Sequence, residues 1–115
     1  LAWIPLVAPT SPPDRVAALA GTCTGFVYAV SSLGVTGVRT SLSERAAAVV
    51  AACREATDLP VLVGIGVSTA DQAVEASRAA DGVVIGSAVV RTLAEEGVEA
   101  MEGFLRGVRD ALDGA

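Results

Sequence analysis

The sequence predicts an α/β fold of four strand–helix units with parallel strands and one extra short helix before the last helix. Three observations predict it. Short runs of mostly β-branched residues are apolar at every position, which is typical of parallel strands buried on both faces. Alanine-rich segments of helical length separate these runs, as in βαβ units with right-handed crossovers. Glycines follow the last two runs, at the strand ends where parallel α/β proteins bind ligands.

The first strand is expected over about residues 3–8 and its helix over about 12–20. The proline-rich segment 9–13 breaks the strand. We expect Ser11 to cap the helix, because serine favours the N-cap position and prolines are tolerated in a first turn. Gly21 is expected to end this helix, as glycine does at many helix C-termini.

The second strand is expected over about residues 25–30. A loop over 31–40 follows, which is longer than the 2–6 residues that usually connect a strand to a helix. Ser41 and Glu44 have the spacing of a capping box, so the next helix is expected over about 43–56.

The third and fourth units repeat this pattern and add a helix. Ser68 is expected to cap the first of these helices, and Gly97 to separate the last two. The strands and helices expected in this part of the chain are 60–64, 69–79, 82–86, 88–96 and 98–112.

Composition limits the possible functions. The 115 residues are 52% apolar and carry a formal net charge of −5, so the chain has room for one domain with its own core. The eight cationic residues are all arginines and are spread singly, which argues against nucleic-acid binding. No apolar run reaches the roughly 20 residues of a membrane helix, and the chain opens without the charged region of a signal peptide. Histidine is absent, which excludes imidazole catalysis and histidine-ligated metal sites.

Two further features concern the origin of the chain. Cys23 and Cys53 lie far apart and show no metal-ligand spacing, which predicts buried free thiols in a reducing, cytoplasmic compartment. The chain opens Leu-Ala-Trp-Ile without an initiator methionine, and its one methionine is Met101. We therefore expect it to be part of a longer protein.

Three glycines and a serine stand at the carboxyl ends of the last two strands: Gly64, Gly66, Gly86 and Ser87. Glycine lets the backbone approach a ligand closely and adopt a positive φ. Ser87 adds a hydroxyl at the start of a helix, where free N–H groups and the helix dipole attract anions. The pattern predicts a phosphate site beside a short extra helix, as in phosphate-binding (β/α)8 barrels. It favours a (βα)4 half of a TIM barrel over the small open doubly wound sheet that length alone favours.

Two other features are candidates for ligand contact. Tyr28 stands near the end of the second strand; core packing is its usual role, but its hydroxyl needs a polar partner or a ligand. The loop from Gly34 to Thr40 is long enough to be a lid or a solvated connector. No nucleophile–base pair and no paired carboxylates stand at the strand ends. The residue pattern alone therefore predicts phosphate binding without chemistry.

Taken together, these stretches resemble the tryptophan synthase alpha subunit. The resemblance covers essentially the whole chain and corresponds to the C-terminal half of that family's barrel, strands five to eight. The Gly-Val-Thr-Gly loop separates this family from other phosphate-binding barrels. The segments that carry the resemblance are Pro5-Leu6-Val7-Ala8-Pro9-Thr10, Phe26-Val27-Tyr28, Ser31, Gly34-Val35-Thr36-Gly37, Pro60 to Ser68 and Asp81 to Ala88.

The resemblance implies a carbon–carbon lyase of tryptophan biosynthesis. Such an enzyme cleaves indole-3-glycerol phosphate into indole and glyceraldehyde 3-phosphate without a cofactor, and passes indole to a beta subunit that holds pyridoxal phosphate. The positions that match the family's phosphate site are Gly37, Gly66, Gly86 and Ser87. The positions that match its indole and glycerol pocket are Tyr28, Gly64 and Ile65, with Thr36 in the closing loop. Ile65 departs from the phenylalanine common in the family.

The family's catalytic carboxylates, a Glu and an Asp from early strands, have no counterpart in this chain. The resemblance therefore implies a fragment that keeps the phosphate site and is inactive alone, because each proton transfer is worth about 10²–10⁴ in rate. The two open edges of a half-barrel predict self-association, as a closed barrel or a domain-swapped dimer. Two alternatives stay open: a non-catalytic phosphate-binding half-barrel module and another phosphate-binding barrel enzyme.

Overall fold

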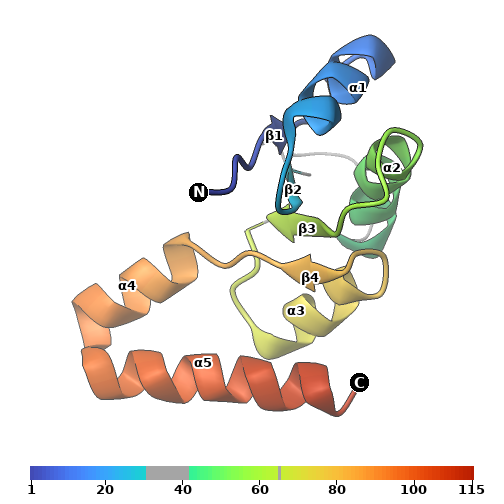
Figure 1. Ribbon diagram of the computed structural model, residues 1–115. Helices are drawn as coiled ribbons and strands as arrows, with labels where there is room; N and C mark the ends of the chain where they lie inside the picture. The colour runs from blue at the N-terminus through green and yellow to red at the C-terminus, as the bar shows by residue number, and fades with distance from the viewer. Residues whose placement is uncertain (31–41, 65) are drawn as a thin grey trace.

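The structure is a computed structural model that describes residues 1–30, 42–64 and 66–115 (Figure 1). Its four strands form one sheet in the order β1-β2-β3-β4, and every neighbouring pair is parallel. The parallel α/β architecture expected from the sequence is confirmed. The elements are β1 (Leu6–Val7), α1 (Pro13–Thr22), β2 (Val27–Val30), α2 (Leu42–Arg54), β3 (Val61–Gly64), α3 (Ala70–Ser77), β4 (Gly82–Val83), α4 (Ser87–Glu96) and α5 (Val98–Asp113).

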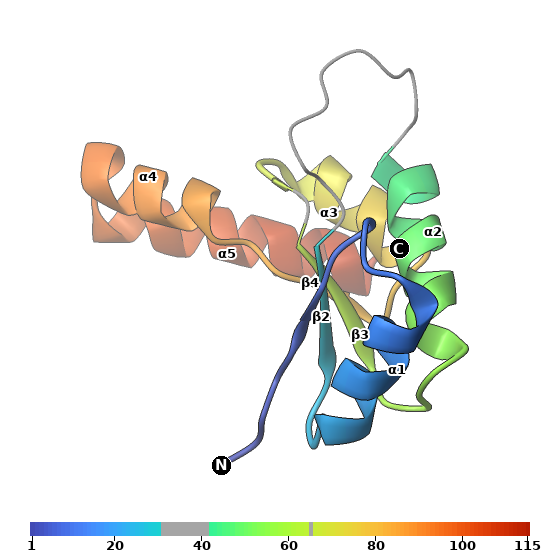
Figure 2. The same ribbon diagram turned by 90° about the horizontal axis from the view of Figure 1, so that it is seen from above.

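One face of the sheet is covered by helices. Helices α1, α2 and α3 lie on the same side of the strands, with α1 against β1, α2 against β2 and β3, and α3 against β4 (Figure 2). The strand residues that point to this side are all buried: Val7, Val27, Ala29, Val61 and Val63. This layer is the core of the molecule.

The opposite face of the sheet has no helix layer over it in the described part of the chain. The residues of that face are in register across the strands: Leu6 pairs with Tyr28, Tyr28 with Leu62, and Leu62 with Gly82. Tyr28 and Leu62 are half-buried, and Leu6 is 62% exposed. The sheet therefore has one finished face and one open face.

The two edge strands are shorter than the sequence predicts. β1 is Leu6–Val7 where residues 3–8 were expected, and β4 is Gly82–Val83 where 82–86 were expected. The central strands β2 and β3 keep four residues each. An edge strand has a hydrogen-bonding partner on one side only, so less of it is held in the ladder.

Two predictions about the ends of α1 are wrong. Ser11 does not cap the helix: its hydroxyl accepts a bond from the Ala8 N–H, and its own N–H donates to the Ala8 carbonyl, so it closes the turn after β1. Pro12 is the N-cap and makes no side-chain cap bond. Gly21 lies inside α1, which ends at Thr22, and it does not adopt the positive φ of a glycine that ends a helix.

The cap of α3 is displaced by one residue from the expected Ser68. Thr69 is the N-cap, and its hydroxyl accepts from the Gln72 N–H at 3.2 Å. The Gln72 side chain in turn accepts from the N–H and the hydroxyl of Ser68, at 2.8 and 2.9 Å. The Thr69 hydroxyl thus caps the helix, while the Gln72 side chain bonds Ser68, one residue before the N-cap, so that the pair differs from a capping box. Ser41, the cap expected for α2, lies outside the described residues.

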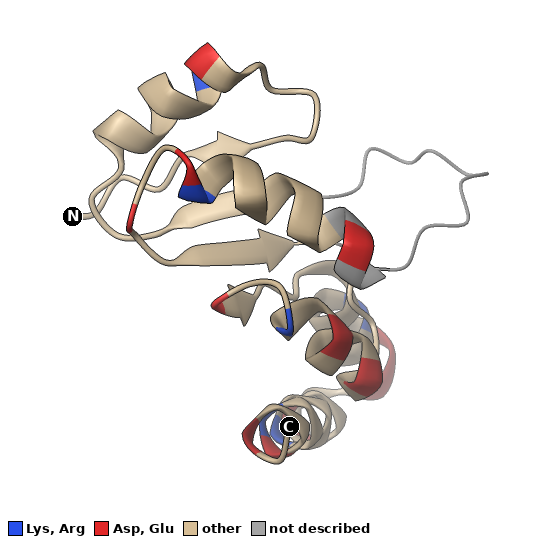
Figure 3. Ribbon diagram, turned by 90° about the vertical axis from the view of Figure 1, so that its right-hand side faces the viewer, with Lys and Arg blue, Asp and Glu red and all other residues tan. Residues whose placement is uncertain are grey.

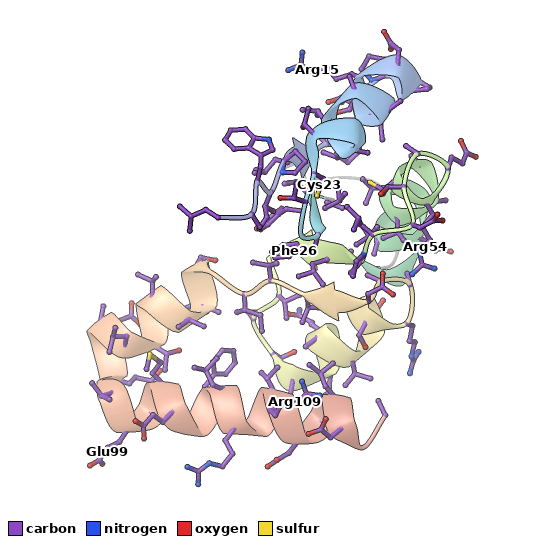
Figure 4. The ribbon with its side chains drawn as sticks, viewed as in Figure 1. Arg15, Cys23, Phe26, Arg54, Glu99 and Arg109 are labelled. Atoms are coloured by element: carbon purple, nitrogen blue, oxygen red, sulfur yellow. The ribbon has the colours of Figure 1, made fainter. Side chains whose placement is uncertain are left out.

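The amino end of the sheet is fixed by Asp81, which precedes β4. Its carboxylate accepts from the buried Val61 N–H at 2.8 Å, and its own N–H donates to the Val61 carbonyl at 3.0 Å. Arg54, at the end of α2, pairs with the same carboxylate at 3.3 Å (Figure 4). The Val61 N–H is the main reason that the Asp81 pKa is lowered, and Arg54 lowers it further. One side chain thus joins β3, β4 and α2.

Both cysteines are buried and free, as expected from their spacing. The Cys23 thiol donates to the Phe26 carbonyl at 2.9 Å, and burial raises the pKa of the Cys53 thiol (Figure 4). Among the helices described, none combines the length and apolar character needed to cross a bilayer. The described residues also contain no group of carboxylates and thiols placed to hold a metal ion.

Candidate phosphate site at the strand tips

An open pocket of about 270 Å³ lies at the carboxyl ends of β2, β3 and β4 and the start of α4. Parallel α/β proteins place their ligands at this end of the strands. The residues that line the pocket are Tyr28, Val30, Gly64, Gly66, Val67, Val84, Gly86 and Ser87.

The start of α4 supplies the polar part of this pocket. Gly86 is the N-cap and makes no side-chain cap bond, and Ser87 is the first helical residue. The Val90 N–H donates to the Gly86 carbonyl at 3.1 Å, which is the first i→i−4 bond of the helix. The N–H groups that precede Val90 therefore have no partner within the helix, and the positive end of the helix dipole lies beside them. This geometry attracts an anion.

Gly66 lies across the pocket from α4 and has φ of +64°. L-residues with a side chain rarely adopt this left-handed conformation, which costs them roughly 1–2 kcal/mol. Both Gly66 and Gly86 are exposed, and a Cβ at either position would meet nothing within 4 Å. The backbone at these two tips is therefore open to a ligand.

Gly64 has a different role, because Tyr28 lies over it. A Cβ built on Gly64 would lie 2.7 Å from the ring carbon that bears the Tyr28 hydroxyl. Only glycine leaves room for the ring at this place. The Tyr28 ring thus forms a wall of the pocket, with its hydroxyl at the end of β3.

Among the described residues that line the pocket there is no carboxylate, arginine or thiol. The arginine, aspartate and glutamate positions are spread along the described helices and turns (Figure 3). The whole chain carries a net charge of −5, and in the described part of the pocket the groups that attract an anion are backbone N–H groups, the helix dipole and the Ser87 hydroxyl. The described residues of the pocket include no general acid or base with a carboxylate.

Five of the eight expected site residues line this one pocket: Tyr28, Gly64, Gly66, Gly86 and Ser87. The other three, Thr36, Gly37 and Ile65, lie outside the described residues. Three lining residues were not expected: Val30, Val67 and Val84.

Two of these three lining residues could have been expected from the two-residue alternation of side chains along a strand. Val30 is two residues after Tyr28, and Val84 is two residues before Gly86, so each lies on the same face as a candidate. Val67, which is 2% exposed, is also part of the core, and its apolar character gives no separate signal.

A larger hollow of about 420 Å³ lies at the open edge of β4, against α3 and α5. Its lining includes Asp81 and Arg109, but Asp81 is engaged with Val61 and Arg54, and Arg109 is paired with Asp113. No convergent, unpaired polar groups are described there. The glycine-lined pocket is the better candidate for a ligand.

Comparison with known proteins identifies the family of the chain. The family model of the tryptophan synthase alpha chain matches residues 1–109. The tryptophan synthase alpha chain of Lactiplantibacillus plantarum is 46% identical over 116 residues, which cover 99% of this chain and 44% of the relative. That of Acidothermus cellulolyticus is 50% identical over 95 residues, covering 83% of this chain and 36% of the relative. The chain thus spans less than half the length of these curated relatives.

Solved structures give the same result for the fold. A structure of Mycobacterium tuberculosis tryptophan synthase superposes with a TM-score of 0.84 at 39% identity, over 97% of this chain and 42% of that chain. The alpha subunit from Campylobacter jejuni superposes with a TM-score of 0.81 at 28% identity, over 94% of this chain and 44% of that chain. The four parallel strands therefore correspond to part of a TIM barrel. With a family model that matches nearly every residue and a fold that agrees, the chain belongs to the tryptophan synthase alpha chain family.

Proposed function

We propose that this chain provides the phosphate-binding part of the active site for the tryptophan synthase alpha reaction. In this reaction a carbon–carbon lyase cleaves indole-3-glycerol phosphate into indole and glyceraldehyde 3-phosphate. One observation carries the proposal: Gly66, Gly86 and Ser87 converge on a single pocket at the N-terminus of α4, in a chain of this family.

The phosphate is held mainly by the backbone. The free N–H groups of the first turn of α4 donate to its oxygens, and the Ser87 hydroxyl donates one further bond. Gly86 and Gly66 let the backbone approach because neither position carries a Cβ. Of the positions outside the described residues, Gly37 completes the phosphate site.

The organic part of the substrate lies against the apolar side of the pocket. Tyr28 and Gly64 border it, with Val30 and Val84 behind them. Ile65 lines the same part of the substrate, and Thr36 belongs to the loop that closes over it. These contacts orient the carbon–carbon bond that breaks.

The chain alone does not complete the reaction. Cleavage of the glycerol side chain from indole requires proton transfers, each worth about 10²–10⁴ in rate, and the described lining of the pocket has no carboxylate to perform them. The acid–base groups come from a part of the protein that is not in this sequence. This conclusion also supports a second candidate function, that of a phosphate-binding module without catalysis.

The complete protein works in the cytoplasm with a beta subunit. That partner takes up indole and uses pyridoxal phosphate, whereas the alpha reaction uses no cofactor. The M. tuberculosis relatives, whose solved structures are described as tryptophan synthase, support such an assembly.

Binding of inorganic phosphate and glyceraldehyde 3-phosphate tests the proposal. We expect both to shift the backbone amide resonances of Gly66, Gly86 and Ser87. Ser87→Ala removes one bond to a charged group, so affinity should fall by about tenfold. Gly103→Ala is a control, because Gly103 lies in α5, away from the pocket, and has open space for a Cβ.

A turnover assay separates the two candidate functions. The chain should release no indole from indole-3-glycerol phosphate, while the complete alpha chain of L. plantarum does so under the same conditions. Phosphate-dependent shifts elsewhere in the chain, with none at these three residues, would contradict the assigned site. Turnover comparable to that of the complete relative would contradict the absence of acid–base groups.

A further inference from the structure

One side of the glycine-lined pocket is formed by the loop between β3 and α3, which the structure describes over residues 66–69. We call this segment the β3–α3 loop. Across the pocket, the N–H groups at the start of α4 belong to a ten-residue helix, which fixes their direction. Gly66 and Val67 also line the pocket, but they belong to neither a strand nor a helix. The shape of this side therefore depends on what holds the β3–α3 loop.

Gly66 does not fix its own conformation. Its φ of +64° is one that glycine enters readily, but glycine has more alternative conformations than any other residue. Gly66 is exposed, and within the described structure the N–H groups of Gly66 and Val67 have no hydrogen-bond partner. Both N–H groups are thus available to a ligand, and the backbone that carries them is held by its neighbours.

Two anchors hold the β3–α3 loop, one apolar and one polar. The Val67 side chain is 2% exposed and packs in the core. Ser68 is exposed, and hydrogen bonds hold it instead: its N–H and its hydroxyl both donate to Oε1 of Gln72, at 2.8 and 2.9 Å. Because both donors of Ser68 meet one acceptor atom, its backbone and its side chain are fixed together. Gln72 is the polar anchor of the loop.

The backbone of Gln72 is itself well fixed. Gln72 lies in the first turn of α3, and its N–H donates to the Thr69 hydroxyl at 3.2 Å. The next residue, Ala73, is fully buried, and its N–H donates to the Thr69 carbonyl at 3.1 Å. The helix packs against α2, α5 and β4. The side chain of Gln72 therefore reaches the loop from a firm base.

The bonds from Ser68 to Gln72 serve the loop more than the helix. Thr69 is the N-cap of α3 and satisfies one N–H of its first turn. In a capping box, the glutamine three residues after the N-cap would accept from the N-cap N–H. Here the glutamine accepts from Ser68, one residue nearer to the pocket. The displacement by one residue ties the loop to α3.

We propose that Gln72 is a positioning residue for phosphate binding: by holding Ser68, it sets the backbone of Gly66 and Val67 before the ligand arrives. This role rests on the proposed function, since the bound group is the phosphate of that substrate. Gln72 is not among the residues described as lining the pocket, so it acts through Ser68 and not by contact. A loop that is already ordered loses less conformational freedom when an anion binds, which strengthens binding.

The alpha reaction of the complete protein that contains this chain tests the proposal. Gln72→Leu removes the acceptor and keeps a residue that favours helices. The loop contacts the phosphate and not the bond that breaks. KM for indole-3-glycerol phosphate should therefore rise by about three- to tenfold, while kcat stays within about twofold. A titration with inorganic phosphate, followed at the amide resonances of Gly86 and Ser87, should show the same loss of affinity.

Two further variants separate positioning from a general effect on the helix. Thr69→Ala removes the N-cap bond of the same helix and should lower the free energy of unfolding at least as much as Gln72→Leu. Its KM should stay within about twofold of wild type, because Gln72 still holds Ser68. Ser68→Ala removes the hydroxyl bond and keeps the N–H bond, so its KM should lie between those of wild type and Gln72→Leu.

The outcomes distinguish this role from the proposed function. If wild type shows phosphate-dependent shifts at Gly66, Gly86 and Ser87 but Gln72→Leu binds phosphate equally well, the positioning role is wrong and the proposed function stands. An equal rise of KM in Thr69→Ala would also overturn the role, since any loosening of the helix start would then suffice. So would a fall of kcat in Gln72→Leu at unchanged KM. Absence of the shifts in wild type would contradict the proposed function itself, and the positioning role with it.

Discussion

The two ends of the parallel strands are built in different ways. At the carboxyl end, Gly66 and Gly86 leave the backbone open around a pocket, and Gly64 makes room for the Tyr28 ring. At the amino end, Asp81 joins β3 and β4 through two hydrogen bonds with Val61, and its carboxylate also pairs with α2. At the amino end one side chain joins the strands to each other, whereas the polar side-chain bonds described at the carboxyl end stay within the turns after β1 and β3.

The difference shows how a small sheet keeps an open site. The Asp81 carboxylate joins the strands at the end where no ligand binds, and the described lining of the pocket at the other end contains no such side chain. Barrel enzymes divide stability and function between their two ends in the same way. Changes at the carboxyl end should therefore alter both stability and phosphate binding, whereas changes at the amino end should alter stability alone.

The largest effect is expected for Gly64→Ala. The new methyl group would lie 2.7 and 2.9 Å from two ring carbons of Tyr28, so the ring must move into the pocket. We expect the free energy of unfolding to fall by about 1–3 kcal/mol and phosphate binding to weaken. Denaturant unfolding and phosphate titration measure the two effects.

Gly82→Ala is the matched control for that substitution. Its methyl group would lie 2.8 Å from the end of the Leu62 side chain, which can rotate into the open face. We expect a smaller loss of stability and unchanged phosphate affinity. Equal losses for the two variants would show that the Tyr28 ring is not a fixed wall of the pocket.

Gly66→Ala should have the next largest effect. Space is available for the methyl group, but φ of +64° is unfavourable for alanine, so unfolding should become easier by about 1–2 kcal/mol. Gly86→Ala has neither a close neighbour nor a positive φ and should change stability by less than about 0.5 kcal/mol. Denaturant unfolding measures both variants, and the reverse order of effects would contradict a conformational role for Gly66.

At the amino end, Asp81→Ala should cost about 1 kcal/mol of stability, because the Val61 N–H loses its acceptor while the half-exposed site admits water. Arg54→Gln removes only an exposed ion pair and should cost less. Neither variant should change phosphate affinity, which titration of the folded variants measures. A loss of affinity in either would show that the two ends are coupled.

Sequence patterns predicted the parts of this fold that depend on burial. The apolar runs around Val27 and Val61 identify the central strands, because the residues of those strands are buried on the helix-covered face and half-buried on the other face. The same patterns overestimated the edge strands, since the number of paired residues depends on a neighbouring strand. The convergence of Gly66 and Gly86 also followed from the sequence, because parallel neighbouring strands end at the same edge.

Other features depend on contacts that no local pattern contains. Ser11 and Ser68 both have the residue type of a helix cap, but the turn after β1 uses one and Gln72 binds the other. The sequence around Asp81 indicates only a turn residue before a strand. That its carboxylate accepts from the Val61 N–H depends on the pairing of β3 with β4. Such contacts become visible only when distant segments are brought together.

The smallest expected effect is the acid dependence of the Asp81 contact. The Val61 N–H, and secondly Arg54, hold the Asp81 pKa in the folded chain below its unfolded value, which is about 3.9. The folded state therefore binds fewer protons, so this contribution is complete above about pH 4 and is lost as the pH falls through the lower, folded pKa. Because the carboxylate is 46% exposed, its contribution should be under about 1 kcal/mol. Denaturant unfolding of wild type and Asp81→Asn should differ at about pH 7, and the difference should shrink as the pH falls below the unfolded pKa of about 3.9. Arg54→Gln should keep part of this pH dependence, since the Val61 N–H remains as the larger cause. A difference between wild type and Asp81→Asn that stays constant over the whole range would show that the carboxylate does not stabilise the amino end by its charge.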